Sequence, residues 1–484
     1  MHDLLIVICR WIFMAIIACF LLLGGHYILS ERGITRAGAK GSAARQRILI
    51  VLMHVLGFAI LLLRDGAFDV QSAVIGGLSL LFLLFAMFAS GKIYRDSDPL
   101  LWNAMLFLLD MGFIILTRLK PADAQRQLLI AFLGFVVMLV VPLALKIVPR
   151  FEKLKWVYLV VGLLMLAAVF VSNTTLFGSQ NWLSLGVLTF QPSELVKLLF
   201  VFYLASVMHE PPKGGRLMFV CGTGAAFVLV LVLQKDLGGA LIFFMTFMIM
   251  LYTSTGKAKL VGLGVGLAAV AAYVSHMVFD HVQTRVSVWQ DPWADISNKG
   301  FQITQSLFAI TTRGLLGSGL SRGGASAIPV VERDFIFSAI CEEFGVLFAL
   351  MLIGVLILLF YRGVHIALRC QRPLYALLSV GLTSILAFQT FIIIGGDINL
   401  IPMTGVTLPF VSYGGTSVFI CVLMVGVLQW LYTMIPVQDK ARRKRTEQLD
   451  KAQRGEEKHM PIKKRAGGER HDRGQDKEQA QAHD

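Results

Sequence analysis

The sequence predicts an all-α polytopic membrane protein, and three observations carry this prediction. Of the 484 residues, 56% are hydrophobic and only 15% are charged. The mean hydropathy is +0.72, well above what a water-soluble domain of ordinary composition shows. Long runs with almost no charge recur along the chain, and each can cross a hydrocarbon core of about 30 Å.

Hydropathy and run length predict about thirteen membrane-spanning helices. In chain order their expected limits are 4–23, 47–63, 70–91, 99–117, 127–149, 155–172, 192–208, 216–233, 237–254, 259–279, 335–361, 376–396 and 410–435. The first run has neither a basic leader nor a small-residue cleavage site, so it is expected to be retained as a helix. The six cysteines show no C-x-x-C spacing and are expected to be small buried hydrophobes.

The net charge of +14 is placed in a way that indicates a membrane and not a nucleic acid as the partner. Lys and Arg concentrate in alternate short connections and in the tail segment "DKARRKRTEQLDK", and "TRLKPADAQRQ" is the single basic connection of the other set. Cytoplasmic loops carry such an excess, and basic segments beside a membrane favour anionic lipids. The pattern predicts an outside N-terminus and a cytoplasmic C-terminus.

Two segments outside the spans have contrasting compositions. The long outer connection 280–334 is rich in aromatic and apolar residues, so we expect a folded extracytoplasmic subdomain near the membrane surface. The tail 437–484 is charged, mixed in sign and poor in aromatic residues, so it is expected to be disordered and cytoplasmic.

Polar residues at span ends are candidates for a functional site, because ionisable groups in a membrane are costly. In "FQPSELVKLLF", Glu194 and Lys197 share one helix face, either as an ion pair at the helix entrance or as the wall of a substrate site. In "LQKDLGGALIFF", Asp236 either only caps its helix or also lines the site. Asp110 inside the fourth span has no assigned role.

Two further stretches combine polar or helix-breaking residues with apolar runs. "GVTLPFVSYGGTSVF" predicts irregular backbone at membrane depth, which either lines a cavity or serves helix packing. "PVVERDFIFSAICEEFG" places Asp334 at the membrane–water boundary. Glu342 and Glu343 are expected about 12–14 Å deeper along the same helix, where at most one faces a cavity and a buried packing contact is the alternative.

These motifs, in this order, resemble the SEDS family of bacterial envelope proteins (shape, elongation, division and sporulation), whose members include RodA, FtsW and SpoVE. The matching stretches lie within about Leu100 to Met434 and are "NWLSLGVLTFQPSELVKL", "QKDLGGALIFF", "RVSVWQDPWADISNKGFQITQSLFAI", "GLLGSGLSRGGASAIPVVERDFIFSAICEEFG" and "FQTFIIIGGDINLIPMTGVTLPFVSYGGTS". The family core has ten spans. The resemblance therefore implies a core over 99–436 and a three-helix N-terminal extension over 1–98.

The resemblance implies an enzyme of the bacterial cytoplasmic membrane. Members of the family polymerise lipid II, an undecaprenyl-pyrophosphoryl disaccharide-peptide, into peptidoglycan glycan strands for elongation, division or sporulation. They work beside a class B penicillin-binding protein transpeptidase. Two alternatives stay open: a lipid II flippase or transporter, which broken polar helices would also suit, and a non-catalytic activator of a transpeptidase, which would not need the retained acids.

The family's essential acid corresponds to Asp334, which would act as a general base on a sugar hydroxyl. The residues expected to bind the substrate are Glu194, Lys197, Lys235, Asp236, Arg285, Gln302, Arg333, Ser412, Tyr413 and Gly414. The basic members of this set would neutralise the leaving pyrophosphate, and a divalent cation, Mg²⁺ or Mn²⁺, is an alternative source of positive charge. The chain departs from the family at Asn181, Lys235 and Asp397, where a basic residue, Pro and an apolar residue are usual.

Overall fold

The computed structural model describes residues 2–32, 36–63, 68–93, 96–147, 150–172, 183–185 and 188–459, and these residues are nearly all helical. The elements are α1 (His2–Arg32), α2 (Arg36–Leu62), α3 (Val70–Ile93), α4 (Pro99–Leu119), α5 (Pro121–Ile147), η2 (Phe151–Leu154), α6 (Lys155–Ser172), β1 (Leu183–Leu185), β2 (Leu188–Phe190), α7 (Pro192–Met208), α8 (Gly215–Leu233), α9 (Leu237–Thr255), α10 (Ala258–Val278), α11 (Asp280–Gln290), α12 (Phe301–Thr312), η3 (Ala325–Ala327), α13 (Val331–Asp334), α14 (Ile336–Phe344), α15 (Val346–Arg369), α16 (Pro373–Asp397) and α17 (Thr416–His459). The unit Met1–Thr433 is compact, and Met434–Asp484 forms a second unit.

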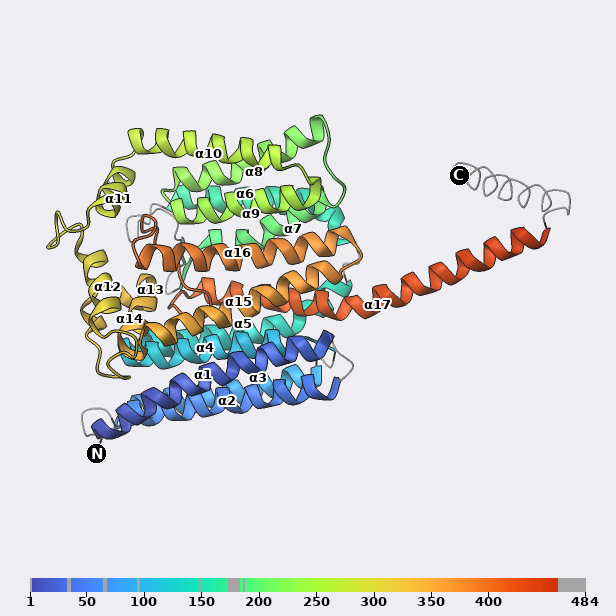
Figure 1. The fold of residues 1–484 in the computed structure, drawn as a ribbon. Helices are drawn as coiled ribbons and strands as arrows, with labels where there is room; N and C mark the ends of the chain where they lie inside the picture. The colour runs from blue at the N-terminus through green and yellow to red at the C-terminus, as the bar shows by residue number, and fades with distance from the viewer. Residues whose placement is uncertain are drawn as a thin grey trace, which may run out of the picture. The chain divides into compact units, whose positions relative to one another are not determined.

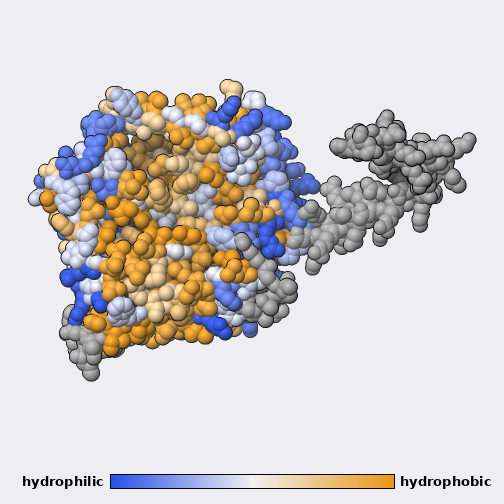
Figure 2. Space-filling model, in the orientation of Figure 1, coloured by the Kyte–Doolittle hydropathy of each residue, from blue (hydrophilic) through white to orange (hydrophobic). Residues whose placement is uncertain are grey.

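The membrane-spanning helices of the first unit run roughly side by side, as Figure 1 shows. Among the described residues, 12 helices are long and apolar enough to cross a membrane. The remaining predicted span is α7, whose 17 residues lie at the short end of the spanning range. Hydrophobic residues cover the face of this unit between two more hydrophilic ends (Figure 2), as a hydrocarbon layer requires. The prediction of about thirteen helices is confirmed.

The predicted span 335–361 is wrong as a single helix, because the chain forms α14 and α15 there. Gly345 separates them with a φ of 93°, a conformation that side-chain-bearing residues rarely adopt. A Cβ at this position would also overlap the backbone of Leu315 and Leu316. Hydropathy could not reveal the break, since a glycine inside an apolar run leaves the run apolar.

The expectation of disorder over 437–484 is wrong for its first part, because α17 continues to His459. Lys, Arg, Glu, Gln and Ala dominate the stretch up to that residue, and all are good helix formers. A helix that is polar all round has no apolar stripe, so its sequence lacks the periodic pattern by which a packed helix is recognised. Residues 460–484 lie outside the described part of the chain, as does Asn181.

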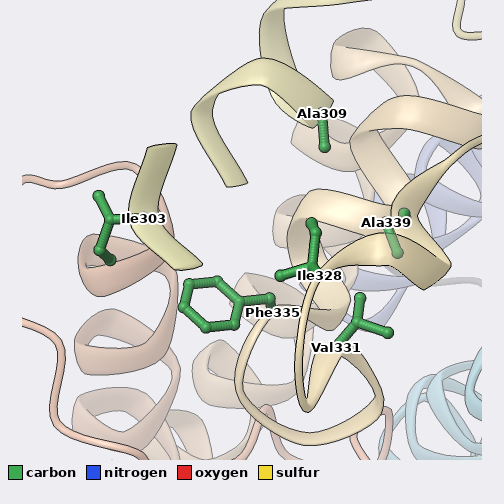
Figure 3. Packing of buried hydrophobic residues seen from close by; sticks show 7 residues of the cluster. Ile303, Ala309, Ile328, Val331, Phe335 and Ala339 are labelled. Carbon is green, nitrogen blue, oxygen red and sulfur yellow. The ribbon is translucent and has the colours of Figure 1, made fainter. Parts of the chain in front are cut away.

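The long connection 280–334 is folded, as predicted. Its helices α11, α12 and α13 gather with α14 at one end of the bundle (Figure 1). A small apolar core holds α12, η3, α13 and α14 together. It consists of Ile303, Ala309, Ala325, Ile328, Val331, Phe335 and Ala339, most of which are visible in Figure 3. Phe335 is 1% exposed and directly follows Asp334, so this core fixes where the acid sits.

Asp110 joins the N-terminal helices to the rest of the bundle. His54 of α2 lies with Nδ1 2.6 Å from Asp110 Oδ1 of α4, and its Nε2 donates to the Gly76 carbonyl of α3 at 3.0 Å. Both side chains are buried. The acid to which the sequence assigns no role therefore ties α2 and α3 to α4 inside the apolar layer.

Candidate active site

A cavity of about 360 Å³ lies where the folded connection meets the ends of the spanning helices. Its walls come from α7, the α8–α9 junction, α11, α12, α13 and the irregular segment between α16 and α17. The lining residues are Gln191, Ser193, Glu194, Lys197, Lys235, Asp236, Gly239, Thr284, Arg285, Val288, Trp289, Lys299, Gln302, Ile303, Val330, Arg333, Asp334, Asn399, Met403, Thr404, Gly405, Val406, Thr407, Tyr413, Gly414 and Ser417. All the predicted site residues except Ser412 are among them.

Asp334 is the last residue of the short helix α13. This helix starts after Val330, whose φ of 60° turns the chain sharply, and the Asp334 amide donates to the Val330 carbonyl at 3.2 Å. The segment opposite approaches closely: a Cβ on Gly405 would lie 3.7 Å from Asp334 Oδ2. Burial raises the pKa of Asp334 to about 6, against the opposing influence of Arg333 and Arg285. The result is a carboxyl group that can exchange a proton near neutral pH.

Arg285 of α11 lines the same cavity as the acid. Burial lowers the pKa of its guanidinium, while Asp236 and Asp334 raise it again. Its Nη1 is buried and has no hydrogen-bond partner among the described residues. Arg333, beside the acid, lies over the ring of Tyr413 at 5.1 Å. Two guanidinium groups thus lie close enough to Asp334 to oppose the rise of its pKa.

Glu194 and Lys197, for which the sequence leaves two roles open, form both an ion pair and a cavity wall. Lys197 Nζ lies 2.7 Å from Glu194 Oε1 and donates to Gln389 Oε1 at 3.1 Å. Gln389 in turn donates to the Thr407 carbonyl at 2.8 Å. The pair therefore connects α7 through α16 to the irregular segment.

The α8–α9 junction supplies a second basic and acidic pair. Asp236 caps α9 by accepting a hydrogen bond from the Gly239 amide at 2.8 Å, as its position before the helix predicts. Lys235, where the family usually has Pro, has a φ of 63°. A non-glycine residue held at a positive φ costs about 1–3 kcal/mol, and such strained residues are found most often at functional sites. Both side chains line the cavity, so Asp236 caps its helix and also forms part of the cavity wall.

The segment between α16 and α17 is irregular, as its Gly, Ser and Pro content predicts. Ser412 does not line the cavity: it is buried, and its Oγ accepts a hydrogen bond from the Leu408 amide at 2.9 Å. The Ser412 hydroxyl thereby stabilises the turn that places Tyr413 at the cavity. Tyr413 is anchored from the other side, since its amide donates to the Glu332 carbonyl at 2.8 Å.

Glu342 and Glu343 lie near the end of α14, which stops at Phe344 and does not continue into the spanning helix α15. Neither side chain lines the cavity. Glu342 Oε1 accepts from the Gly324 amide at 2.8 Å, and Glu343 Oε1 lies 3.1 Å from Arg118 Nε. The alternative of a buried packing contact is correct, although the partners are a loop and α4.

Sequence reasoning missed several residues that complete the cavity. Lys299 adds a cation, and Trp289 exchanges hydrogen bonds with Asn399 at 3.2 and 3.1 Å, which ties α11 to the irregular segment. Trp289 and Lys299 lie inside the motif "RVSVWQDPWADISNKGF", and Asn399 lies inside "GGDINL", but no spacing rule distinguishes them from their neighbours. Only the folded arrangement brings them together.

The assembled site suits an anionic ligand. Five lining side chains are cationic (Lys197, Lys235, Arg285, Lys299 and Arg333) and three are carboxylates (Glu194, Asp236 and Asp334). Four buried lining atoms have no hydrogen-bond partner within the described residues: Ser193 Oγ, Glu194 Oε2, Arg285 Nη1 and Thr404 Oγ1. Such orphaned groups are rare in folded proteins, and a bound polar ligand would satisfy them.

The described residues do not build a metal site from protein ligands. No group of three or more His, Cys, Asp or Glu side chains within them could hold a metal ion. The carboxylates of the cavity are instead interleaved with Lys and Arg. These Lys and Arg side chains place positive charge at the site.

Comparisons with known proteins agree with this geometry. Residues 100–434 match the FtsW, RodA and SpoVE family, described as cell cycle proteins. The chain is 30% identical over 361 residues to peptidoglycan glycosyltransferase RodA of Mycobacterium tuberculosis, covering 69% of this chain and 77% of that protein. It is 33% identical over 355 residues to stage V sporulation protein E of Bacillus subtilis, covering 68% of this chain and 95% of that protein.

Solved structures show the same fold. A chain from a structure on the coordination of polymerization and crosslinking by a peptidoglycan synthase complex superimposes with a TM-score of 0.61 and 26% identity, covering 70% of this chain and 98% of that one. The crystal structure of the rod shape determining protein RodA of Thermus thermophilus gives a TM-score of 0.51 and 25% identity, covering 70% and 97% of the two chains.

Proposed function

The chain belongs to the FtsW, RodA and SpoVE family of cell cycle proteins, and we propose that the cavity around Asp334 is where this peptidoglycan glycosyltransferase polymerises lipid II. It is a multi-pass protein of the bacterial cytoplasmic membrane. The observation that carries the proposal is a half-buried acid of raised pKa beside orphaned buried polar atoms in a cationic cavity.

In the proposed reaction the Asp334 carboxylate accepts the proton of the acceptor sugar's 4-hydroxyl. The freed oxygen attacks the anomeric carbon of the donor sugar, and a new glycosidic bond forms with inversion at that carbon. The bond between this carbon and the pyrophosphate oxygen breaks, and the lipid pyrophosphate leaves with the electron pair. A base of pKa near the working pH suits this step, because it is ionised and still basic.

The cations of the cavity support the leaving group. Arg285 lines the same cavity as Asp334, and its unpartnered Nη1 can donate to a pyrophosphate oxygen. Lys197, Lys235, Lys299 and Arg333 add positive charge around the same space. Fixed donors aimed at developing negative charge need no reorganisation during the reaction, which lowers its barrier.

We extend the proposal to partner, domains and orientation. The resemblance to a peptidoglycan synthase complex chain supports a class B penicillin-binding protein transpeptidase as the partner. The family match starting at residue 100 supports a division into an extension over 1–98 and a core over 99–436. The alternate basic connections support an outside N-terminus and a cytoplasmic C-terminus, with the cavity at the outer face.

Purified protein should polymerise lipid II in detergent micelles, with its transpeptidase partner added if required. Micelles have no second leaflet, so a flippase activity produces no signal there. The measurement is the appearance of glycan strands on a gel. No strands under any partner condition would instead favour a lipid II flippase or a non-catalytic activator of the transpeptidase.

The rate of polymerisation should depend on pH through Asp334. Because its pKa is raised from 3.8 to about 6, the base is protonated and inactive below that pH. We expect kcat/KM to rise with pH to a plateau, with the midpoint of the acidic limb near 6. Arg333→Gln should move the midpoint to higher pH, since Arg333 holds the pKa down. A rate that stays constant down to about pH 4 would contradict the role of Asp334.

A further inference from the structure

The outer end of α1 contacts the segment that leads to Asp334. Ile6, Arg10 and Phe13 are spaced four and three residues apart, so they lie on one face of α1. Arg10 Nη1 donates to the Gly317 carbonyl at 3.1 Å. Ile6 packs so closely on Gly319 that a Cβ there would overlap its Cγ2. The ring of Phe13 lies 5.4 Å from that of Phe344, the last residue of α14.

The segment that α1 contacts, residues 314–319, is bonded to both sides of the break between α14 and α15, and we call it the clasp. The amides of Ser318 and Gly319 donate to the carbonyls of Glu342 and Glu343, each at 2.8 Å. On the far side of the break, the Leu347 amide donates to the Leu315 carbonyl at 3.2 Å. A Cβ at Gly317 would overlap the Gly345 backbone, so the two chain segments are in direct contact.

The clasp fixes one end of the short helix α14, and a single residue separates the other end of α14 from Asp334. Helix α14 has 9 residues and begins one residue after Phe335, which follows Asp334 directly. Its far end is also held by Glu343, which pairs with Arg118 of α4 at 3.1 Å. A shift of the clasp would move α14 as a unit and, through the buried Phe335, would displace Asp334 at its other end.

An arginine inside an apolar span is costly, and Arg10 lies within the span Ile6–Glu31. Hydrophobic packing of α1 would be served better by Met or Leu at this position. Its Nη1 instead donates to a carbonyl of the clasp, about 12 Å along α1 from its first residue. A hydrogen bond from a membrane-embedded arginine to the backbone of another segment indicates that the arginine positions that segment.

We propose that the N-terminal extension is a positioning device for the active site, in which Arg10 of α1 holds the clasp at 314–319 and thereby sets the place of Asp334. This inference rests on the proposed role of Asp334. It gives the three additional helices a function in catalysis beyond membrane anchoring. Arg10 is not among the residues that line the cavity, so it is a positioning residue.

The test is Arg10→Met in the full-length protein. Met keeps the apolar stem and removes a charge from the membrane span, so folding and insertion should be retained. Since a misplacement of about 1 Å at a reacting group can cost about 100-fold, we expect kcat for lipid II polymerisation to fall by about tenfold, with KM changed less than about twofold. Hydrogen exchange of the amides in 314–319 and in α14 should become faster.

Three variants make the test decisive. Arg10→Lys keeps a donor and should restore most of kcat, and Leu22→Ala, on an exposed position of α1, should change neither kcat nor hydrogen exchange. Unchanged kcat and exchange in Arg10→Met would overturn the proposal. Loss of kcat without faster exchange at the clasp, or equal loss in Leu22→Ala, would overturn it as well. If Asp334→Asn kept its activity, the proposed function would fail, whatever Arg10→Met does.

Discussion

Asp334→Asn should lower the rate of lipid II polymerisation by about 10²- to 10⁴-fold, the usual contribution of a general base. Asn has the same shape and can still accept a hydrogen bond, but it cannot take a proton from the acceptor hydroxyl. The cavity and its five cations stay in place, so binding of lipid II should change little. The rate is measured as glycan strand formation in detergent micelles under saturating substrate.

Glu332→Gln is the matched control for this prediction. Glu332 lies on the same short helix, two residues before Asp334, and pairs with Lys120 at 3.0 Å outside the cavity lining. Because its side chain does not reach the cavity, its rate should stay within about threefold of the unmodified protein. Equal losses in the two variants would indicate damage to α13, and an Asp334→Asn rate above about a tenth would remove Asp334 as the base.

The spans and several of the residues that line the cavity could be predicted from the sequence for a simple physical reason. Membrane-spanning helices must be long and apolar, so hydropathy alone locates them. Polar residues inside or beside such runs are costly, which makes Glu194, Lys197, Asp236 and Asp334 conspicuous in the sequence itself. The resemblance then adds Arg285 and Gln302, which sit in an otherwise ordinary amphipathic stretch.

The features that could not be predicted depend on backbone conformation or on contacts between distant residues. The break at Gly345 depends on a positive φ and on the close approach of Leu315. Ser412 lies in the right motif, but the direction of its hydroxyl depends on the Leu408 amide. Glu343 pairs with Arg118, which is 225 positions away in the chain. Hydropathy and short motifs carry no information about such pairs.

Arg362 illustrates the same limit and leads to the prediction with the largest effect on stability. It falls in a basic stretch that the positive-inside pattern marks as a cytoplasmic loop, yet its side chain is fully buried. Its Nε donates to Asp98 Oδ2, and its Nη2 lies 3.4 Å from Glu31 Oε1. Asp98 also caps α4 by accepting from the Leu100 amide at 3.0 Å. One guanidinium thus joins the ends of α1, α4 and α15.

Arg362→Met should lower the free energy of unfolding by about 3–5 kcal/mol, because it leaves Asp98 as a buried carboxylate without its cation and removes the nearer cation of the half-buried Glu31. The measurement is the midpoint of thermal unfolding in detergent. Arg369→Met is the control: Arg369 is on the same helix and lies 3.7 Å from Glu31, but its side chain is 45% exposed. Such an exposed pair is worth about 0–1 kcal/mol, so its loss should hardly move the midpoint.

Adding Asp98→Asn to Arg362→Met should recover part of the lost stability. Asn removes one stranded charge and still accepts the hydrogen bond that caps α4, so the main cost that remains is Glu31. If Arg362→Met and Arg369→Met shifted the midpoint equally, the ion pairs of Arg362 with Asp98 and Glu31 would not be what joins the C-terminal end of α1 to the core. The extension would then depend on the pair of His54 with Asp110 and on the apolar contacts of its helices.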